Sequence, residues 1–302
     1  AEIEAPFIES LMDAAVLVES STDRSVVTDL AVFSDGGAVV AWEEPKGDAE
    51  GYAARARFVG GNGLVDGDAL TLNQTVAGDQ RAPAVDVLDD DAWIAAFWGA
   101  DNQVYTRHYD RTGAPVPGEV ERLVSVERSA EQSTALSAQS PKDGTILMVW
   151  ASTQNGEGTS DIFARRFAAD GAPLTADIPV SSHPGLLAWE VSAVVASQRP
   201  EGGWIVAWAA DTADAPSTAG DVVIQRIASN GTLEGVPIIL GSDDKCLAVP
   251  SLVADPNGFM VAWEEYRPDI ALESAEHEIA GQLFDHDGTA RSMATKLNPD
   301  PE

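Results

Sequence analysis

The sequence predicts an all-β protein, a β-propeller of about five four-stranded antiparallel blades within a single domain, residues 1–302. Three observations support this fold class. An aromatic strand ending recurs along the chain, a tight turn rich in Gly and Asp precedes it, and a third strand followed by a glycine comes after it. Short strands repeated at this period are typical of propeller blades packed around an axis.

The aromatic strand endings show the repeat most clearly. Five apolar segments, AVVAW, WIAAF, ILMVW, WIVAW and FMVAW, end at Trp42, Phe97, Trp150, Trp208 and Trp263. Their spacings are 55, 53, 58 and 55 residues. Because every unit carries one such residue, we expect these aromatic side chains to pack between blades rather than to bind a ligand.

The remaining strands of each unit follow from turn residues and alternation. A third segment with a period of two precedes a turn glycine, and a fourth apolar segment completes the unit; the glycines are Gly63, Gly113, Gly171, Gly231 and Gly288. The repeat units therefore span approximately 28–81, 82–132, 133–190, 191–248 and 249–298.

Residues 14–20, AAVLVES, resemble a fourth segment without its first three strands. We expect them to pair with the last blade and close the ring, which would protect an open sheet edge. A larger ring that uses further residues is the alternative. A string of three sandwich domains would show about twice the observed period, and no linker marks its boundaries.

The charge balance excludes several partners. Asp and Glu number 49 against 18 Lys and Arg, a formal net charge of −31. Nucleic acid and anionic lipid would be repelled. No apolar run approaches the ~20 residues that a membrane-spanning helix needs, so no membrane insertion is expected. The surface suits a salt-adapted or simply soluble protein, or one with a cationic or metal-bridged partner.

One segment carries a family resemblance. SDIFARRFAADG, residues 160–171, and more loosely the other units, resemble the W…D-I-x-x-R-x-F…D-x-x-G repeats of secreted and surface proteins of bacteria. The resemblance covers nearly the whole chain and is generic. It implies a propeller and an extracellular, periplasmic or cell-surface location, and it implies no activity.

Familiar catalytic strings such as G-x-S-x-G and H-E-x-x-H are absent. A propeller glycosidase would need paired carboxylates where first strands open onto the central channel, and Asp29, Asp86 and Glu190 are candidates. The third and fifth units offer no acid at the comparable place. The sequence therefore favours a non-catalytic binding or assembly module of the bacterial envelope or extracellular space, with a protein or carbohydrate partner; the alternative is a five-bladed carbohydrate-active enzyme.

Variable connections from second to third strand, and from fourth strand to the next unit, share one face of a propeller. Aromatic residues that lie outside the repeat pattern on this face are the candidate ligand-binding residues, together with one adjacent acid: Trp98, Trp189, Glu190 and Tyr266. The competing interpretation is that these aromatic side chains cap the rim of the core.

Two acidic pairs suggest a metal site. Glu43 and Glu44 follow Trp42, and Glu264 and Glu265 follow Trp263. In a closed ring of five the first and fifth blades are neighbours, so four carboxylates would gather and Ca²⁺ would relieve their repulsion. The alternative is that they are solvated, or paired with Lys46 and Arg267. No other cofactor is expected.

Overall fold

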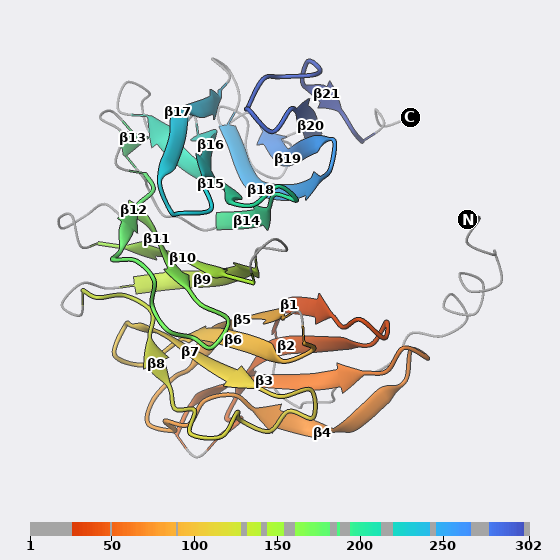
Figure 1. Cartoon of the computed structure of the whole chain (residues 1–302), viewed down its shortest axis with the longest axis vertical. Coiled ribbons are helices and arrows are strands. Elements are labelled where there is room, and N and C mark those ends of the chain that lie inside the picture. The colour runs from red at the N-terminus through yellow and green to blue at the C-terminus, as the bar shows by residue number, and fades with distance from the viewer. Residues whose placement is uncertain are drawn as a thin grey trace. The chain divides into compact units, whose positions relative to one another are not determined.

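The computed structural model describes residues 26–48, 50–88, 90–127, 132–139, 144–153, 161–181, 186–187, 194–212, 220–241, 246–266 and 278–298. Within these ranges the chain is all-β, without a helix, and it forms five antiparallel sheets, each from one continuous stretch of sequence (Figure 1). The predicted all-β class with five successive antiparallel sheets is confirmed. Residues 14–20 lie outside the described ranges, so closure of a ring by this segment stays a prediction.

The sheets follow the order of the chain. Sheet 1 contains β1 (Val26–Val32), β2 (Ala38–Pro45), β3 (Tyr52–Val59) and β4 (Val65–Thr71). Sheet 2 contains β5 (Arg81–Val87), β6 (Trp93–Trp98), β7 (Val104–Tyr109) and β8 (Arg122–Leu123). Sheet 3 contains β9 (Gln132–Gln139), β10 (Ile146–Ser152), β11 (Asp161–Phe167) and β12 (Ile178–Pro179).

The C-terminal half contributes the last two sheets. Sheet 4 contains β13 (Leu186–Leu187), β14 (Val194–Gln198), β15 (Trp204–Thr212), β16 (Gly220–Ile227) and β17 (Leu233–Leu240). Sheet 5 contains β18 (Cys246–Asp255), β19 (Gly258–Tyr266), β20 (Glu278–Phe284) and β21 (Thr295–Lys296). The chain divides into two compact units, Ala1–Ala100 with Arg107–Glu121 and Asp101–Thr106 with Arg122–Glu302, which are described separately below.

The second strand of each sheet is the most apolar, and the repeated aromatic residue near its end is buried. Trp42, Phe97, Trp150, Trp208 and Trp263 are each at most 3% exposed. Every described residue of β10 is buried as well. A strand that is buried on both faces has a continuous apolar sequence, and these five segments have such sequences. The prediction that these aromatic side chains belong to the core is confirmed.

Sheets pack face to face within each unit. In the N-terminal unit Phe58 of sheet 1 meets Trp93 of sheet 2 edge to face at 5.9 Å, and Trp93 stacks on Tyr109 at 4.3 Å. In the C-terminal unit one apolar cluster joins sheets 3 and 4 through residues such as Val149 and Trp204, and another joins sheets 4 and 5. Burial of these apolar faces against one another is the main stabilising contribution to the fold.

The turn after the third strand contacts the preceding sheet in sheets 2 and 4. Gly113 has a φ of +84°, and an added Cβ would meet Leu70 and Phe58 of sheet 1. Gly231 has a φ of +90°, and its Cβ would lie 3.1 Å from Ile178 of sheet 3. Only glycine adopts this backbone conformation without strain while also allowing so close an approach.

Two details differ from the sequence expectation. The fourth strands β8, β12 and β21 are two residues long, and β12 ends at Pro179, which has no N–H to donate. Sheet 4 also gains β13 from a stretch expected to be a loop. Leu186 pairs with Thr212 and Leu187 with Asp211, because β15 continues past β14 and offers a free edge there.

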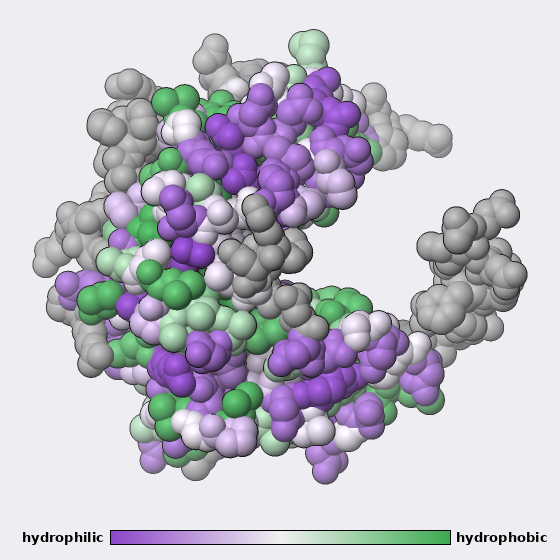
Figure 2. Space-filling model, in the orientation of Figure 1, coloured by the Kyte–Doolittle hydropathy of each residue, from purple (hydrophilic) through white to green (hydrophobic). Residues whose placement is uncertain are grey.

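The surface is largely hydrophilic. Purple residues cover most of the visible face of β2 to β4, and likewise of β18 to β21, in Figure 2. This agrees with the net charge of −31. Among the described residues, no helix has the length and hydrophobicity needed to cross a membrane.

Candidate functional site

The N-terminal unit presents a cluster of charged residues where β2 ends and β3 and β5 begin. We call this the loop-bearing end of the unit, because the variable connections lie here. Pairing of the first strand with the second is interrupted nearby by a register shift, between Val27 and Asp29 in sheet 1 and between Arg81 and Ala84 in sheet 2. Bulges of this kind redirect side chains and are frequent beside functional sites.

Among the described carboxyl groups of this unit with a shifted pKa, Asp29 is the one whose pKa is raised. It lies on the first strand of sheet 1, half-buried, directly after the register shift. Its Oδ2 accepts the backbone N–H of Val85 at 2.9 Å and its Oδ1 accepts that of Leu30 at 2.8 Å. Burial raises the pKa of Asp29 above its ordinary value, although both hydrogen bonds act to lower it.

The contact with Val85 brings Asp29 to the first strand of sheet 2, one residue before Asp86. Asp86 is half-buried and has an interaction partner. The two acids that the sequence nominated in this half of the chain therefore lie on adjacent first strands of one compact unit. Glycoside hydrolysis uses a pair of carboxyl groups, and Asp29 and Asp86 are the candidate pair in this unit.

The beginning of β5 is held in an unusual conformation. Ala82 has a φ of +47°, which is uncommon for a residue with a side chain, and its N–H donates to Glu43 Oε2 at 3.3 Å. Arg81 next to it lies over the ring of Tyr52, with its guanidinium carbon 3.5 Å from the ring centroid. Strained backbone at the start of an inner strand is typical of positions fixed by their surroundings.

Arg81 is neutralised by two carboxylates. Its Nη2 donates to Asp79 Oδ2 at 2.8 Å, and its Nη1 lies 3.8 Å from Glu43 Oε1. The hydrogen bond from Arg81, helped by the N–H of Tyr52, holds the pKa of Asp79 below its ordinary value. Neither Tyr52 nor Asp79 was nominated by the sequence. Tyr52 begins a repeated third strand and was assigned to that pattern, while Asp79 is one of many acids in the chain.

The four glutamates proposed as calcium ligands fall in different units. In the N-terminal unit Glu44 Oε2 lies 3.1 Å from Arg55 Nε, and Glu43 contacts Arg81 and Ala82. The alternative that the glutamates are paired with cations applies to these two, with Arg55 and Arg81 as partners. In the C-terminal unit Glu265 accepts the indole N–H of Trp263 at 2.9 Å. Within the described ranges no group of three or more His, Cys, Asp or Glu could hold a metal ion. The calcium hypothesis stays a prediction.

The predicted ligand-binding residues are only partly described. Trp98 is half-buried at the end of β6, where it pairs with Arg81, and its indole N–H is buried without a hydrogen-bond partner. Tyr266 is half-buried at the end of β19, in the other unit. Trp189 and Glu190 lie outside the described residues. Trp98 is therefore the one member of the predicted set that the structure brings beside the charged cluster.

No protein-family model matches the sequence, and no curated protein resembles it in sequence. Solved structures do share its fold. The polysaccharide lyase Uly1 has a TM-score of 0.56 at 7% identity, over 89% of this chain and 72% of that one. A Hadza microbial sialidase, Hz136, has a TM-score of 0.52 at 11% identity, over 91% of this chain and 58% of that one. An endo-arabinase from Bacteroides thetaiotaomicron has a TM-score of 0.46 at 13% identity, over 84% and 93%.

The fold is propeller-like. Identities this low establish similarity of fold alone, and closure of the ring is not part of what they establish. The similar structures do not establish the specific repeat motif of bacterial surface proteins either, so the part of the family resemblance that they support is the propeller-like fold.

The main functional interpretation drawn from the sequence was wrong. A non-catalytic binding or assembly module was expected, but the solved structures of similar fold include a polysaccharide lyase and a sialidase, both of which are carbohydrate-active enzymes. The alternative interpretation is favoured instead. Asp29 carried too little weight in that interpretation, because a single acid among 49 acidic residues is inconspicuous until its burial is known.

Proposed function

We propose that this chain is a carbohydrate-active enzyme that hydrolyses glycosidic bonds at the first strands of its N-terminal unit, β1 and β5. The observation that supports the proposal best is Asp29, a half-buried carboxyl group on the first strand of sheet 1 with a raised pKa. The propeller-like fold shared with enzymes that act on carbohydrates adds support.

The chemistry requires a proton donor and a second carboxylate. The donor protonates the glycosidic oxygen as the bond to the anomeric carbon breaks, and the second carboxylate activates water or attacks that carbon. Asp29 suits the donor role because burial keeps its proton at a higher pH than an exposed Asp does. Asp86 on the adjacent first strand suits the second role.

The neighbouring groups suit sugar recognition. Trp98 offers a half-buried aromatic ring at the end of β6, and Glu43 offers a carboxylate at the same end. Aromatic faces combined with a few polar groups are the usual composition of sugar-binding sites.

Release of reducing ends from a panel of polysaccharides tests the proposal. We expect hydrolysis by the wild-type protein and a loss on the order of 10²-fold or more in Asp29→Asn and in Asp86→Asn, since each removes a group used in the transition state. Asp66→Asn is the matched control, because this substitution removes the same charge at an exposed position on the outer strand β4. Full activity in both test variants, or no hydrolysis of any glycan, would overturn the proposal.

A further inference from the structure

Two arginines at the loop-bearing end of the N-terminal unit are held by carboxylates. Arg81 is bound by Asp79 at 2.8 Å and lies 3.8 Å from Glu43. Arg55 lies 3.1 Å from Glu44 and also donates to Thr71. Lys46, in the turn after β2, has an interaction partner as well. The positive charges of Arg81 and Arg55 are therefore already matched by carboxylates.

The geometry of these pairs leaves little for an anionic ligand. A bidentate guanidinium that binds a substrate carboxylate or sulfate must present its paired N–H groups to that ligand. In Arg81 the Nε and Nη2 atoms both donate to Asp79 Oδ2, and one face of the guanidinium is covered by Tyr52 at 3.5 Å. The edge used for carboxylate recognition is thus occupied from within the protein.

A carboxylate also contacts β5, the strand that hydrogen-bonds the candidate proton donor. Glu43 touches Ala82 on the same strand that Asp29 contacts at Val85, and the whole chain carries a net charge of −31. An approaching anionic sugar would meet the same sign of charge from the nearby side chains and from the overall field.

We infer that the substrate is an uncharged glycan and that glycans carrying carboxylate or sulfate groups are rejected. The inference rests on the proposed function for the location of the site. It separates this chain from any propeller enzyme that uses arginines to bind an acidic sugar. Selection occurs by like-charge repulsion and by the internal pairing of Arg81, rather than by the shape of the site.

Affinity electrophoresis in native gels that contain one polysaccharide each tests the inference. Linear arabinan and xylan are the neutral probes, and polygalacturonate and alginate are the anionic ones. We expect wild-type protein to be retarded by a neutral probe, with at least about tenfold weaker retardation by both anionic probes. The difference in retardation between neutral and anionic probes should decrease as NaCl is added, because salt screens repulsion between exposed charges.

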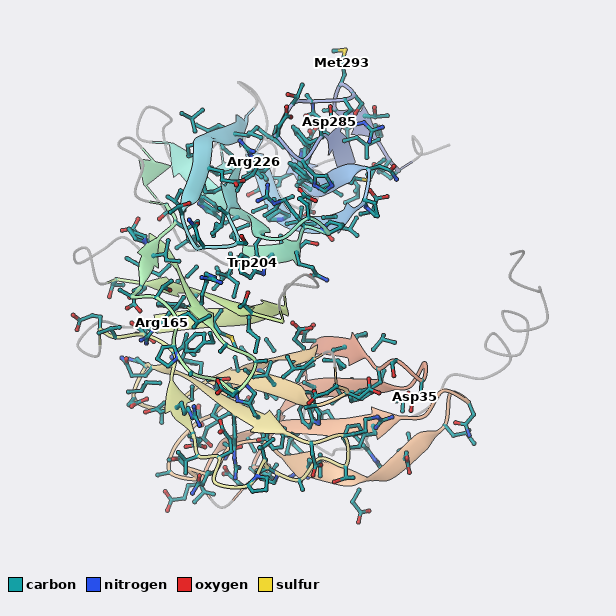
Figure 3. All side chains as sticks on the ribbon, in the orientation of Figure 1. Asp35, Arg165, Trp204, Arg226, Asp285 and Met293 are labelled. Atoms are coloured by element: carbon teal, nitrogen blue, oxygen red, sulfur yellow. The ribbon has the colours of Figure 1, made fainter. Side chains whose placement is uncertain are left out.

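A double variant reports on the mechanism. Glu43→Gln with Asp79→Asn releases Arg81 while keeping both side chains of similar size, so retardation by polygalacturonate should rise toward that by arabinan. Asp35→Asn is the control, because Asp35 pairs with Arg111 at 2.9 Å in the turn between β1 and β2, away from the loop-bearing end (Figure 3). It should leave the preference unchanged.

The outcomes separate the inference from the proposed function. Strong retardation of the wild type by an anionic probe, absence of retardation by every neutral probe, or no response in the double variant overturns the inference. Neutral glycan bound without release of reducing ends overturns the proposed function and leaves the inference standing. Cleavage confined to anionic glycans overturns the inference and leaves the proposed function standing.

Discussion

The indole N–H of Trp263 donates to Glu265 Oε1 at 2.9 Å, two residues further along the chain. The equivalent indole N–H groups of Trp42, Trp150 and Trp208 are buried without a hydrogen-bond partner. In sheet 1 the residue in the place of Glu265 is Glu44, and Arg55 pairs with its carboxylate instead. One repeated position thus serves two different purposes in sheets that share the same pattern.

This hydrogen bond predicts a specific loss of stability. Glu265→Ala leaves a buried indole N–H unpaired, which costs about 1–3 kcal/mol. Urea unfolding should therefore show a lower free energy of unfolding for Glu265→Ala. Glu265→Gln keeps an acceptor and should stay close to the wild type. Equal destabilisation in both variants would show that the charge, not the hydrogen bond, matters.

The environment of Asp29 predicts a pH dependence with a definite sign. Its pKa is raised in the folded protein, so between the ordinary value of 3.8 and the raised value the native state holds more protons than the unfolded state. The stability that Asp29 contributes is fully present below pH 3.8 and is lost as pH rises through the folded pKa. Asp29→Asn should lack this decline, and thermal unfolding measured across pH checks it.

Asp35 is a control for which the pH dependence of stability has the opposite sign. Hydrogen bonds from the Gly37 N–H and from Arg111 lower its pKa, so its contribution is present above pH 3.8 and is lost as pH falls through the lowered value. Comparison of Asp35→Asn with the wild type should therefore show the reverse trend. If Asp29 is the proton donor, hydrolysis should also decline as pH rises through its pKa; an activity profile that Asp29→Asn leaves unchanged in shape would contradict this.

The turn glycines predict a steric effect that can be separated from backbone strain. Gly113 and Gly118 have φ values of +84° and +83°, but a Cβ on Gly118 would meet nothing within 4 Å, whereas one on Gly113 would strike Leu70. Gly118→Ala should cost about 1–3 kcal/mol through strain alone. Gly113→Ala should cost clearly more, because sheets 1 and 2 must move apart. Equal costs in chemical denaturation would rule out the close contact.

Calcium binding can be tested directly. A site formed by Glu43, Glu44, Glu264 and Glu265 predicts heat on calorimetric titration of metal-stripped protein with Ca²⁺, together with a higher melting temperature. Both signals should disappear in the double variant Glu43→Gln with Glu264→Gln. No heat in the wild type, or the same response in the double variant, would end the hypothesis. The arginine partners of Glu43 and Glu44 would have to exchange for the ion.

Much of the fold was readable from local pattern. The buried tryptophans, the apolar second strands and the turn glycines all follow from residues near one another in sequence, because strand periodicity and positive φ are local properties. The two-residue length of the fourth strands and the presence of β13 could not be predicted in this way. They depend on which edge of a neighbouring strand is free to pair.

By itself the sequence determined an all-β chain of repeated antiparallel sheets, its acidic surface, and the places of Asp29, Asp86 and Trp98 along it. Only the tertiary structure decided what those residues meet. Asp29 reaches Val85, Glu43 reaches Ala82, and Arg81 lies between Asp79, Glu43 and Tyr52. The physical reason is that a pKa or an ion pair depends on burial and on neighbours brought together by the packing of successive sheets, which sequence spacing does not specify.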